Sequence, residues 1–340
     1  MNKIVRRAVF GVLCIIFAAI VLSAVYRFLN APVAPDAGSV LFAVKKGESV
    51  QSIAQNLEKQ GLIRSSNFAI AYTRLHGISL KAGMFQLSPN MKTTRIIDTL
   101  YKGKESTVRV TIPEGLSVKK TARYLEKSGL VSASEFISAA SKTGFLESYG
   151  IPGKSAEGFL FPDTYYFPHG TDADSIVGVM VSTFFKKASL LAAYPDDVQN
   201  LYNKVILASI VEREYRVVDE APLIASVFSN RLKIGMGLQS CATVEYILTE
   251  IQGKPHPEKL LLEDLEIQND YNTYIWAGLP PGPISSPGLV ALEAAFKPAT
   301  TDFLYFRLTD TIKGTHSFTR SLDEHVKAGR SLELKRTVSN

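Results

Sequence analysis

One run of apolar residues near the N-terminus restricts the fold of this chain more than any other feature of its sequence. Residues 8–25, AVFGVLCIIFAAIVLSAV, carry no charged side chain, and as an α-helix they are long enough to cross the hydrocarbon core of a bilayer. Lys3, Arg6 and Arg7 precede the run, and an excess of basic residues marks the cytoplasmic side of a membrane helix. The sequence therefore predicts a cytoplasmic tail over residues 1–7 and an extracytoplasmic location for everything after the run.

A cleaved signal peptide is the alternative interpretation of the same residues. The run is longer than the usual apolar core of a signal peptide, and the bulky Tyr26 and Phe28 follow the small residues at which cleavage would be expected. We therefore expect a retained, single-pass transmembrane helix over residues 8–29, in contact with membrane lipid, in the plasma membrane.

Composition excludes several classes of protein. The 340 residues are 46% hydrophobic, which is enough to bury a sizeable core. The formal net charge of +6 comes from basic residues scattered among acidic ones, so nucleic acid is not expected as a partner. Cys14 and Cys241 lie in unlike surroundings and are not expected to pair, and the five dispersed histidines lack the spacing of a zinc site. Neither a metal nor another bound cofactor is expected.

Two segments after the apolar run share one order of predicted elements. Residues 41–63 combine a short strand, a Lys-Gly turn and a helix with apolar residues three and four apart. Residues 108–130 repeat a strand, a Pro-Glu-Gly turn and a helix. The first segment resembles a LysM-like module, a fold that binds N-acetylated sugar chains in many cell-wall proteins, although any amphipathic βα unit has a similar pattern.

The remaining residues alternate Pro- and Gly-rich segments with helical ones. Helices are predicted over residues 196–216, 222–232 and 288–296, and short strands over 303–308 and 316–318. Helices mixed with hairpin strands favour an α+β fold over a doubly wound sheet. The predicted organisation is a tail (1–7), a single N-terminal transmembrane helix (8–29), a linker (30–39), a small LysM-like βα module (40–105), a second βα module (106–150) and a mixed α+β domain (151–335).

A carboxyl group stands out in the longest predicted helix. The segment VILASIVEREY is apolar for most of its length before it presents Glu212. A carboxyl at the edge of an apolar surface is held in its neutral form, as a general acid acting near neutral pH requires. Ala208 and Ser209 lie on the same face of the helix, and their small side chains are expected to leave room for a substrate.

The helix pattern by itself also fits a purely structural role. Glu212 would then begin the solvated end of the helix and pair with Arg216, four residues later. Glu214 is expected to point away from Glu212, so the two cannot form the carboxylate pair of a glycosidase. The pattern alone therefore leaves both interpretations of Glu212 open and offers one acid candidate.

Several motifs in a fixed order resemble the endolytic murein transglycosylase (YceG-like) family, and together they cover most of the exported chain. They are EGFLFPDTY (157–165), ASIVERE (208–214), VFSNRL (227–232), GLQS (237–240), YNTY (271–274), GLPPGPISSPG (278–288) and the final LYF (304–306) with GTHSF (314–318).

The resemblance implies that Glu212 is the catalytic general acid and base of a lytic transglycosylase, which is a lyase. Such an enzyme protonates the oxygen between N-acetylmuramic acid and N-acetylglucosamine, then deprotonates the C6 hydroxyl that closes onto C1, leaving a 1,6-anhydro end. The resemblance further implies peptidoglycan glycan strands as substrate, peptidoglycan synthases as neighbouring partners, and a place in the bacterial inner membrane. The domain over 151–335 would be periplasmic and catalytic.

Polar side chains within these motifs are candidates for holding the sugar. Asn and Gln bind N-acetyl and hydroxyl groups, Tyr rings stack on sugar faces, and rigid Pro-Gly loops hold backbone donors in place, although the same residues also serve as caps and turns. The candidate substrate-binding residues are Glu157, Asp163, Glu214, Asn230, Gln239, Ser240, Thr243, Tyr246, Asn272, Tyr274, Ser285 and His316.

The chain departs from the family at one place and leaves two other functions open. Cys241-Ala242 stands where Asp-Pro commonly follows Gln-Ser, and a cysteine without a His partner is more often a small packed residue than a reactive thiol. One alternative function is a hydrolase of the same bond, with Glu157 or Asp163 as second acid. The other is a non-catalytic, membrane-anchored peptidoglycan-binding scaffold, which the Cys241-Ala242 departure supports and the apolar surroundings of Glu212 oppose.

Overall fold

The structure is a computed structural model that describes residues 3–103 and 106–329. The chain divides into two compact units. The first contains the residues up to Val108 together with 168–170, and the second contains 109–167 and the residues from Thr171 onward. The predicted boundary at residue 105 and the predicted end of the catalytic domain at 335 lie outside the described residues.

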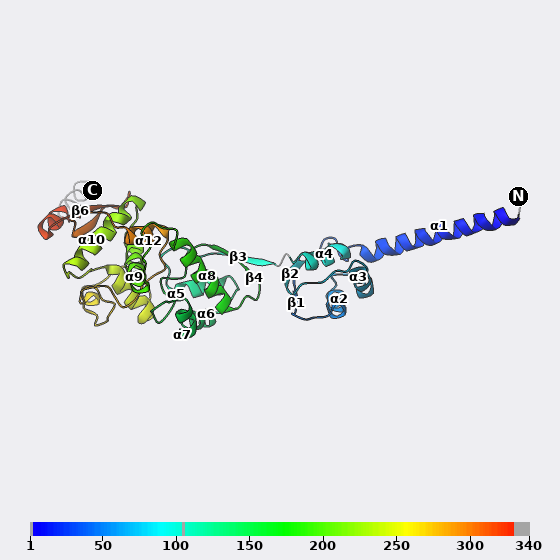
Figure 1. Ribbon diagram of the computed structural model, residues 1–340, viewed down its shortest axis with the longest axis horizontal. Coiled ribbons are helices and arrows are strands. Elements are labelled where there is room, and N and C mark those ends of the chain that lie inside the picture. Colours follow the sequence, from blue (N-terminus) through cyan, green and yellow to red (C-terminus); the bar gives the residue numbers. More distant parts are fainter. Residues whose placement is uncertain (1–2, 104–105, 330–340) are drawn as a thin grey trace. The chain divides into compact units, whose positions relative to one another are not determined.

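The first unit begins with the long helix α1, Lys3–Asn30, which contains the predicted membrane span (Figure 1). Its segment Phe10–Asn30 is long and apolar enough to cross a bilayer. The most apolar part of this segment is not buried against the rest of the described chain. Such an unburied apolar surface is compatible with a single-pass membrane anchor.

The end of α1 is bonded to the small module that follows it. The Tyr26 ring meets the Phe68 ring edge-on, with centroids 5.5 Å apart, and the Arg64 guanidinium lies over the Phe28 ring at 5.1 Å. Arg64 also donates a 2.7 Å hydrogen bond to the carbonyl oxygen of Pro32. Residues at the start of the predicted linker are therefore held against the module.

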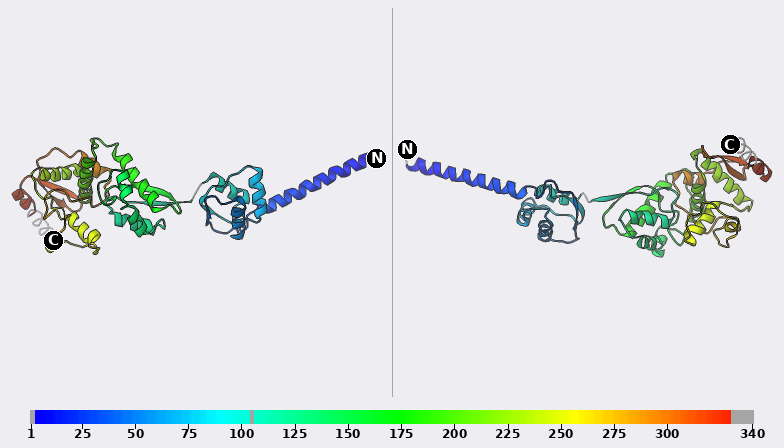
Figure 2. Two further views of the ribbon diagram at one scale, coloured as in Figure 1. Left: turned by 60° about the horizontal axis from the view of Figure 1, so that its bottom comes forward. Right: turned by 180° about the vertical axis from the view of Figure 1, so that it is seen from behind.

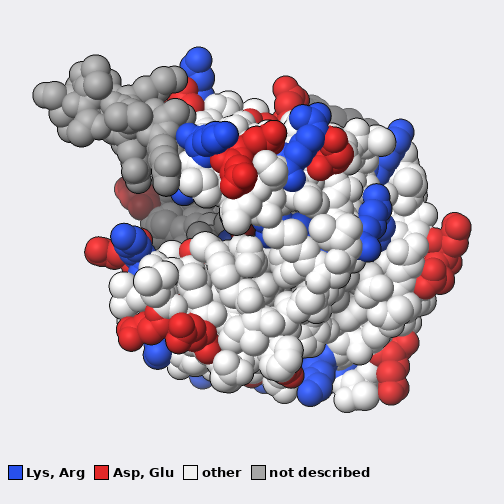
Figure 3. Space-filling view, turned by 90° about the vertical axis from the view of Figure 1, so that its left-hand side faces the viewer, with Lys and Arg blue, Asp and Glu red and all other residues white. Residues whose placement is uncertain are grey.

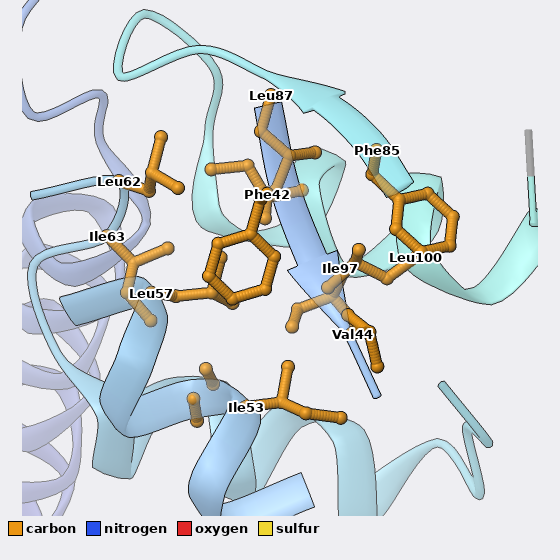
Figure 4. Packing of buried hydrophobic residues seen from close by; sticks show 13 residues of the cluster. Phe42, Val44, Ile53, Leu57, Leu62, Ile63, Phe85, Leu87, Ile97 and Leu100 are labelled. Carbon is orange, nitrogen blue, oxygen red and sulfur yellow. The ribbon is translucent and has the colours of Figure 1, made fainter. Parts of the chain in front are cut away.

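The small module packs three helices against a two-stranded sheet. Strands β1 and β2 are antiparallel, and Phe42 lies opposite Phe85 in the register. Figure 4 shows Phe42, Leu57 and Ile97 directed into one buried cluster, to which strands and helices both contribute. Its elements are β1 (Val40–Val44), α2 (Val50–Lys59), α3 (Ser66–Leu75), β2 (Gly83–Leu87) and α4 (Thr93–Lys102). The resemblance of this module to LysM-like modules stays a prediction.

The predicted internal repeat is visible in the local structure. In each copy a strand leads to a helix that has a serine as its N-cap, Ser49 in the first copy and Ser117 in the second. The side chain of each serine accepts a hydrogen bond from a backbone N–H of its helix. Each of these helices is followed by a glycine in the left-handed conformation, Gly61 with φ 68° and Gly129 with φ 72°. The second copy comprises β3 (Thr107–Thr111), α5 (Val118–Lys127) and α6 (Ala133–Ala139).

The second unit is built around helix α9, Val198–Glu214, which packs against α10 and α12 (Figures 1 and 2). Residues 205–211 of α9 are buried on all sides, as expected of a helix without a polar face in that stretch. The other elements are α7 (Thr143–Ser148), β4 (Thr164–Pro168), α8 (Ala173–Ala188), η1 (Val218–Glu220), α10 (Ala221–Lys233), α11 (Cys241–Tyr246), the π-helical turn η2 (Ile247–Ile251), η3 (Glu263–Glu266), α12 (Leu289–Phe296), β5 (Tyr305–Asp310) and β6 (Thr315–Thr319).

The predicted mixed α+β class is confirmed. The described residues form three two-stranded sheets, β1–β2, β3–β4 and β5–β6, among many helices. Helices α9, α10 and α12 and the strands β5 and β6 begin and end within two residues of the predicted bounds. On the face of the molecule in Figure 3, acidic and basic side chains lie next to one another and much of the surface is uncharged.

Candidate active site

Glu212 lies at the C-terminal end of α9, where the helix leaves the buried core. Its Oε2 accepts a 2.9 Å hydrogen bond from the backbone N–H of Gly288, at the start of α12. Among the described residues no ion pair joins Glu212 to Arg216. The purely structural alternative, a solvated helix end in which these two residues pair, therefore does not describe this carboxyl.

Burial raises the pKa of Glu212 to about 7. The Gly288 N–H opposes this shift, the negative charge of Glu114 adds to it, and a hydrogen bond from Tyr215 and the charge of Arg213 lower it. The carboxyl is thus protonated in a large fraction of molecules near neutral pH, as a proton donor needs to be.

The small residues that precede Glu212 do not leave an open surface, contrary to our expectation. Ala208 and Ser209 are fully buried, because the 278–288 loop covers this face of α9. The Ser209 hydroxyl accepts a 3.0 Å hydrogen bond from the Ile284 N–H, and Ser285 donates to the Ser209 carbonyl at 3.0 Å. The small side chains let the loop approach the helix, and the loop in turn brings Gly288 to Glu212.

Gly158, in the 157–165 motif, packs closely against the same loop. Gly158 has φ 84°, and a Cβ there would lie 2.6 Å from Pro283 and 2.8 Å from Val205. Only glycine combines this backbone conformation with so close an approach. The 157–165 and 278–288 motifs are therefore parts of one packing arrangement around α9.

A second carboxyl, that of Glu114, meets the same loop. It belongs to the Pro-Glu-Gly turn between β3 and α5, and it occupies the space that a Cβ on Gly288 would need. The backbone of this turn is bonded to the loop by Gly115 N–H to Ser286 O at 2.9 Å and Ser286 N–H to Leu116 O at 2.8 Å. The turn was predicted, but Glu114 and Tyr215 were not among the predicted site residues. The isolated acid in a glycine turn was the available signal for Glu114.

Glu157 is buried at the N-terminus of α5. Both of its carboxylate oxygens lie 3.1 Å from the Val118 N–H, and the Tyr246 hydroxyl donates to it at 3.5 Å. Burial raises the pKa of Glu157 to about 8, against the hydrogen bond from Val118, and the nearby charge of Glu250 raises it further. Glu157 and Tyr246 both line a cavity of about 370 Å³.

Replacing Glu157 with Gln is expected to change how stability depends on pH. Because the folded pKa lies above the unfolded value of 4.5, Glu157 stabilises the fold most at low pH, and that contribution is lost as pH rises through about 8. From pH 5 to pH 8 the free energy of unfolding should therefore fall by roughly 1–3 kcal/mol less in Glu157→Gln than in the wild type. Urea unfolding followed by fluorescence of Trp276, the single tryptophan, measures the difference; parallel curves for the two proteins would contradict it.

Several of the other candidate residues gather around Glu214. Ser240 donates to the Glu214 carboxyl, so Glu214 is directed away from the Gly288 contact of Glu212, as the helical spacing predicted. A cavity of about 580 Å³ opens here, and its lining includes Arg213, Glu214, Gln239, Cys241, Tyr274 and His316.

Three candidates lie inside the protein with their polar groups bonded to it. Asn272 donates to the carbonyls of Leu265 and Ile267 at 3.0 and 2.9 Å. Thr243 bonds the Ser240 carbonyl at 2.7 Å, and Ser285 bonds the α9 backbone as described. We infer that these residues shape the loops and do not themselves contact a substrate.

Asp163 and Asn230 are bonded elsewhere. Lys187 pairs with Asp163 at 2.8 Å, and its hydrogen bond holds the pKa of Asp163 below the usual range. Asn230 donates to the carbonyls of Thr301 and Phe303 at 2.9 and 3.0 Å, which joins α10 to the segment before β5. Within the described residues neither side chain is hydrogen-bonded to Glu212, and the lowered pKa of Asp163 does not suit an acid role.

The departure at Cys241-Ala242 places a thiol on the surface of the larger cavity. Cys241 is exposed, not packed, and its Sγ lies 3.1 Å from the Tyr274 hydroxyl. Although the residue is exposed, partial desolvation of its sulfur raises the pKa of the Cys241 thiol, which disfavours the thiolate. The thiol is therefore poorly suited to act as a nucleophile.

The chain is similar to proteins of a known family. A family model described as the YceG-like family matches residues 42–331. The chain belongs to the YceG-like family. A relative from Bacillus subtilis, named endolytic murein transglycosylase, is 31% identical over 306 residues, which are 84% of this chain and 82% of that protein.

Two further relatives agree with this membership. A Streptococcus pneumoniae protein, also named endolytic murein transglycosylase, is 29% identical over 84% of this chain and 57% of its own length. The crystal structure of a YceG-like protein from Listeria monocytogenes matches with a TM-score of 0.56 and 31% identity, over 86% of this chain and 99% of that one. The resemblance drawn from the motifs is thus confirmed.

Proposed function

We propose that this chain is an endolytic murein transglycosylase, a lyase that cuts peptidoglycan glycan strands, with Glu212 as its general acid and base. The names of the curated YceG-like relatives support the activity and the substrate class. The observation that carries the role of Glu212 is its geometry: a largely buried carboxyl with a pKa near 7 at the end of the central helix, bonded to a backbone N–H of a family motif.

In the proposed reaction Glu212 first gives its proton to the glycosidic oxygen between N-acetylmuramic acid and N-acetylglucosamine. The bond from C1 to that oxygen breaks, and the leaving sugar departs as an alcohol. The carboxylate then takes the proton from the C6 hydroxyl of the muramic residue as its oxygen bonds to C1. The electrons and protons balance without water, and Glu212 is again protonated at the end.

The Gly288 N–H suits this double task. It bonds one oxygen of the carboxyl, Oε2, in the structure. When the carboxyl loses its proton, the same N–H donates to a full negative charge and holds it in place. The 278–288 loop therefore acts as the support of the acid in the proposed site.

The proposed location is a bacterial inner membrane, with the second unit on the periplasmic side. The apolar, unburied α1 supports an anchor, and the basic residues before the apolar run support the orientation. Glycan strands are the proposed partner, with peptidoglycan synthases nearby, and glycan binding by the small module follows only if its LysM-like character holds.

The chemical form of the product tests this function against the hydrolase alternative. The purified full chain in detergent is incubated with uncrosslinked glycan strands in water enriched in ¹⁸O, and the new ends are weighed by mass spectrometry. A transglycosylase leaves 1,6-anhydro ends without ¹⁸O. Ends heavier by one water and labelled with ¹⁸O would establish the hydrolase, and unchanged strands would favour the scaffold.

The activity of the wild-type enzyme should fall at alkaline pH. The general acid needs its proton, and Glu212 loses that proton as pH rises through about 7. Initial rates should accordingly fall about tenfold for each pH unit well above that value. Measuring the rate of anhydro-end formation from pH 5 to pH 9 tests this, and a rate that stays constant up to pH 9 would rule out a titrating acid at this pKa.

A further inference from the structure

The Pro-Glu-Gly turn brings a second acidic side chain to the residue that binds Glu212. A Cβ built on Gly288 would lie 2.6 Å from Cδ and 3.0 Å from Cγ of Glu114. On the other side, the Gly288 nitrogen lies 2.9 Å from Glu212 Oε2. Since the nitrogen and the Cβ position of one residue are about 2.5 Å apart, Glu114 Cδ and Glu212 Oε2 are separated by at most about 8 Å.

The backbone fixes this approach on both sides. The two hydrogen bonds between the turn and Ser286 hold residues 115 and 116 against the loop. Gly115 has φ 74°, which glycine adopts without strain. A Cβ built on Gly115 would lie 3.7 Å from Cγ of Glu212, so the turn passes close to that side chain. The backbone therefore brings the turn that carries Glu114 close to Glu212.

We propose that Glu114 is a positioning residue of the active site, whose fixed negative charge keeps the proton on Glu212 until the glycosidic oxygen accepts it. This inference rests on the proposed function, since it assigns Glu114 a role through the acid of that reaction. Glu114 is exposed, whereas Glu212 is largely buried, so the two carboxyls have unlike surroundings. Two neighbouring carboxyls with unlike surroundings commonly divide acid and charge roles in this way.

The other groups around Glu212 fit the same division. Glu114 is the acidic group among those that act on it, and its charge raises the pKa of Glu212, whereas Arg213 and the hydrogen bonds from Gly288 and Tyr215 lower it. Glu114 therefore offsets part of the stabilisation that these donors give to the ionised form.

The remaining elements packed against α9 direct their charged groups elsewhere. On α11, Glu245 is paired with Arg213 at 2.9 Å. On α10, Arg231 donates to backbone carbonyl oxygens, and on α12 the exposed Glu293 lines a separate hollow with Lys297. Removing the charge of Glu114 should thus change the proton affinity of Glu212 without disturbing another ion pair.

The first test is the pH profile of Glu114→Gln in the full chain. Without the negative charge the pKa of Glu212 falls, so the alkaline decline in kcat should move about half to one pH unit lower. At pH 5.5, where Glu212 is protonated in both proteins, the rate should stay within about threefold of wild type. KM should change little, because the substrate contacts are retained. Glu147→Gln removes an equal charge from an exposed position on α7 and should leave the profile unchanged.

A second variant tests the contact without removing the charge. Gly288 has φ −80° and ψ 179°, a conformation that alanine adopts freely, so Gly288→Ala mainly displaces the flexible Glu114 carboxyl from its seat. The alkaline decline should move in the same direction as in Glu114→Gln. In a Glu114→Ala background, adding Gly288→Ala should cause no further shift. This variant keeps the test valid if Glu114→Gln folds poorly.

The results separate this inference from the proposed function. An unmoved alkaline decline, or an equal loss of rate at every pH, in both variants would overturn the role of Glu114 while Glu212 and the anhydro product stand. A rise in KM with an unmoved profile would also overturn it, because it would make Glu114 a substrate contact. Ends labelled with ¹⁸O in the wild type would instead sink the proposed function, and the role of Glu114 with it.

Discussion

Glu212→Gln should lower the rate of glycan cleavage by about 10²–10⁴-fold at pH 6.5, the range that a general acid commonly contributes. The amide has the shape of the protonated carboxyl, and its oxygen can still accept the hydrogen bond from the Gly288 N–H. It has no proton to give to the leaving oxygen and cannot take one from the C6 hydroxyl. Initial rates of anhydro-end formation on uncrosslinked strands measure the loss.

The fold of Glu212→Gln should be unharmed. Replacing a buried acid by a neutral amide removes a desolvation cost at high pH, so thermal unfolding should occur at the wild-type temperature or slightly above it. Glu147→Gln, which should keep full activity, controls for the loss of one carboxyl. If Glu212→Gln cleaves strands at the wild-type rate, Glu212 is not the acid, whatever the product is.

The largest effect on stability is expected from Gly158→Ala, with a loss of about 3 kcal/mol in the free energy of unfolding of the second unit. Alanine is strained at φ 84°, and its Cβ would meet the Pro283 ring at 2.6 Å and Val205 at 2.8 Å. Neither neighbour is the free end of a flexible side chain, so the loop must move away from α9. Unfolding followed by Trp276 fluorescence reports on this unit.

A matched variant separates the two causes of that loss. Gly129 has a similar φ of 72°, but nothing lies within 4 Å of a Cβ there. Gly129→Ala should therefore cost only the backbone strain, about 1 kcal/mol. An equal loss in both variants would mean that the contact with Pro283 and Val205 contributes nothing. Gly158→Ala should also reduce activity, since the displaced loop carries Gly288.

The sequence predicted the elements whose periodicity reflects burial. Helix α9 was expected because its apolar residues form an uninterrupted stretch, and the serine-capped helices of the two repeats were expected from Ser49 and Ser117 with their following glycines. These signals are local, so one segment is enough to interpret them. The family motifs also pointed to Glu212, which the helix pattern alone had left undecided.

The contacts between distant segments were not predictable in the same way. Ser209 was expected to border open space, but its hydroxyl is used by a loop 75 residues later. Glu114 is still farther along the chain from Gly288, and no periodicity connects a turn residue with a loop residue. Asn272 and Ser285 are residue types that commonly bind sugars. Their side chains bond the protein backbone instead, which only the folded arrangement of the loops reveals.

The attachment of α1 to the small module bears on how the protein would sense its bilayer. A helix that spans a membrane changes its tilt when the hydrocarbon thickness changes. The edge-to-face contact of Tyr26 with Phe68 and the contacts of Arg64 with Phe28 and Pro32 join the end of the helix to the module. A change in the tilt of α1 within a bilayer would therefore reach the module through these contacts.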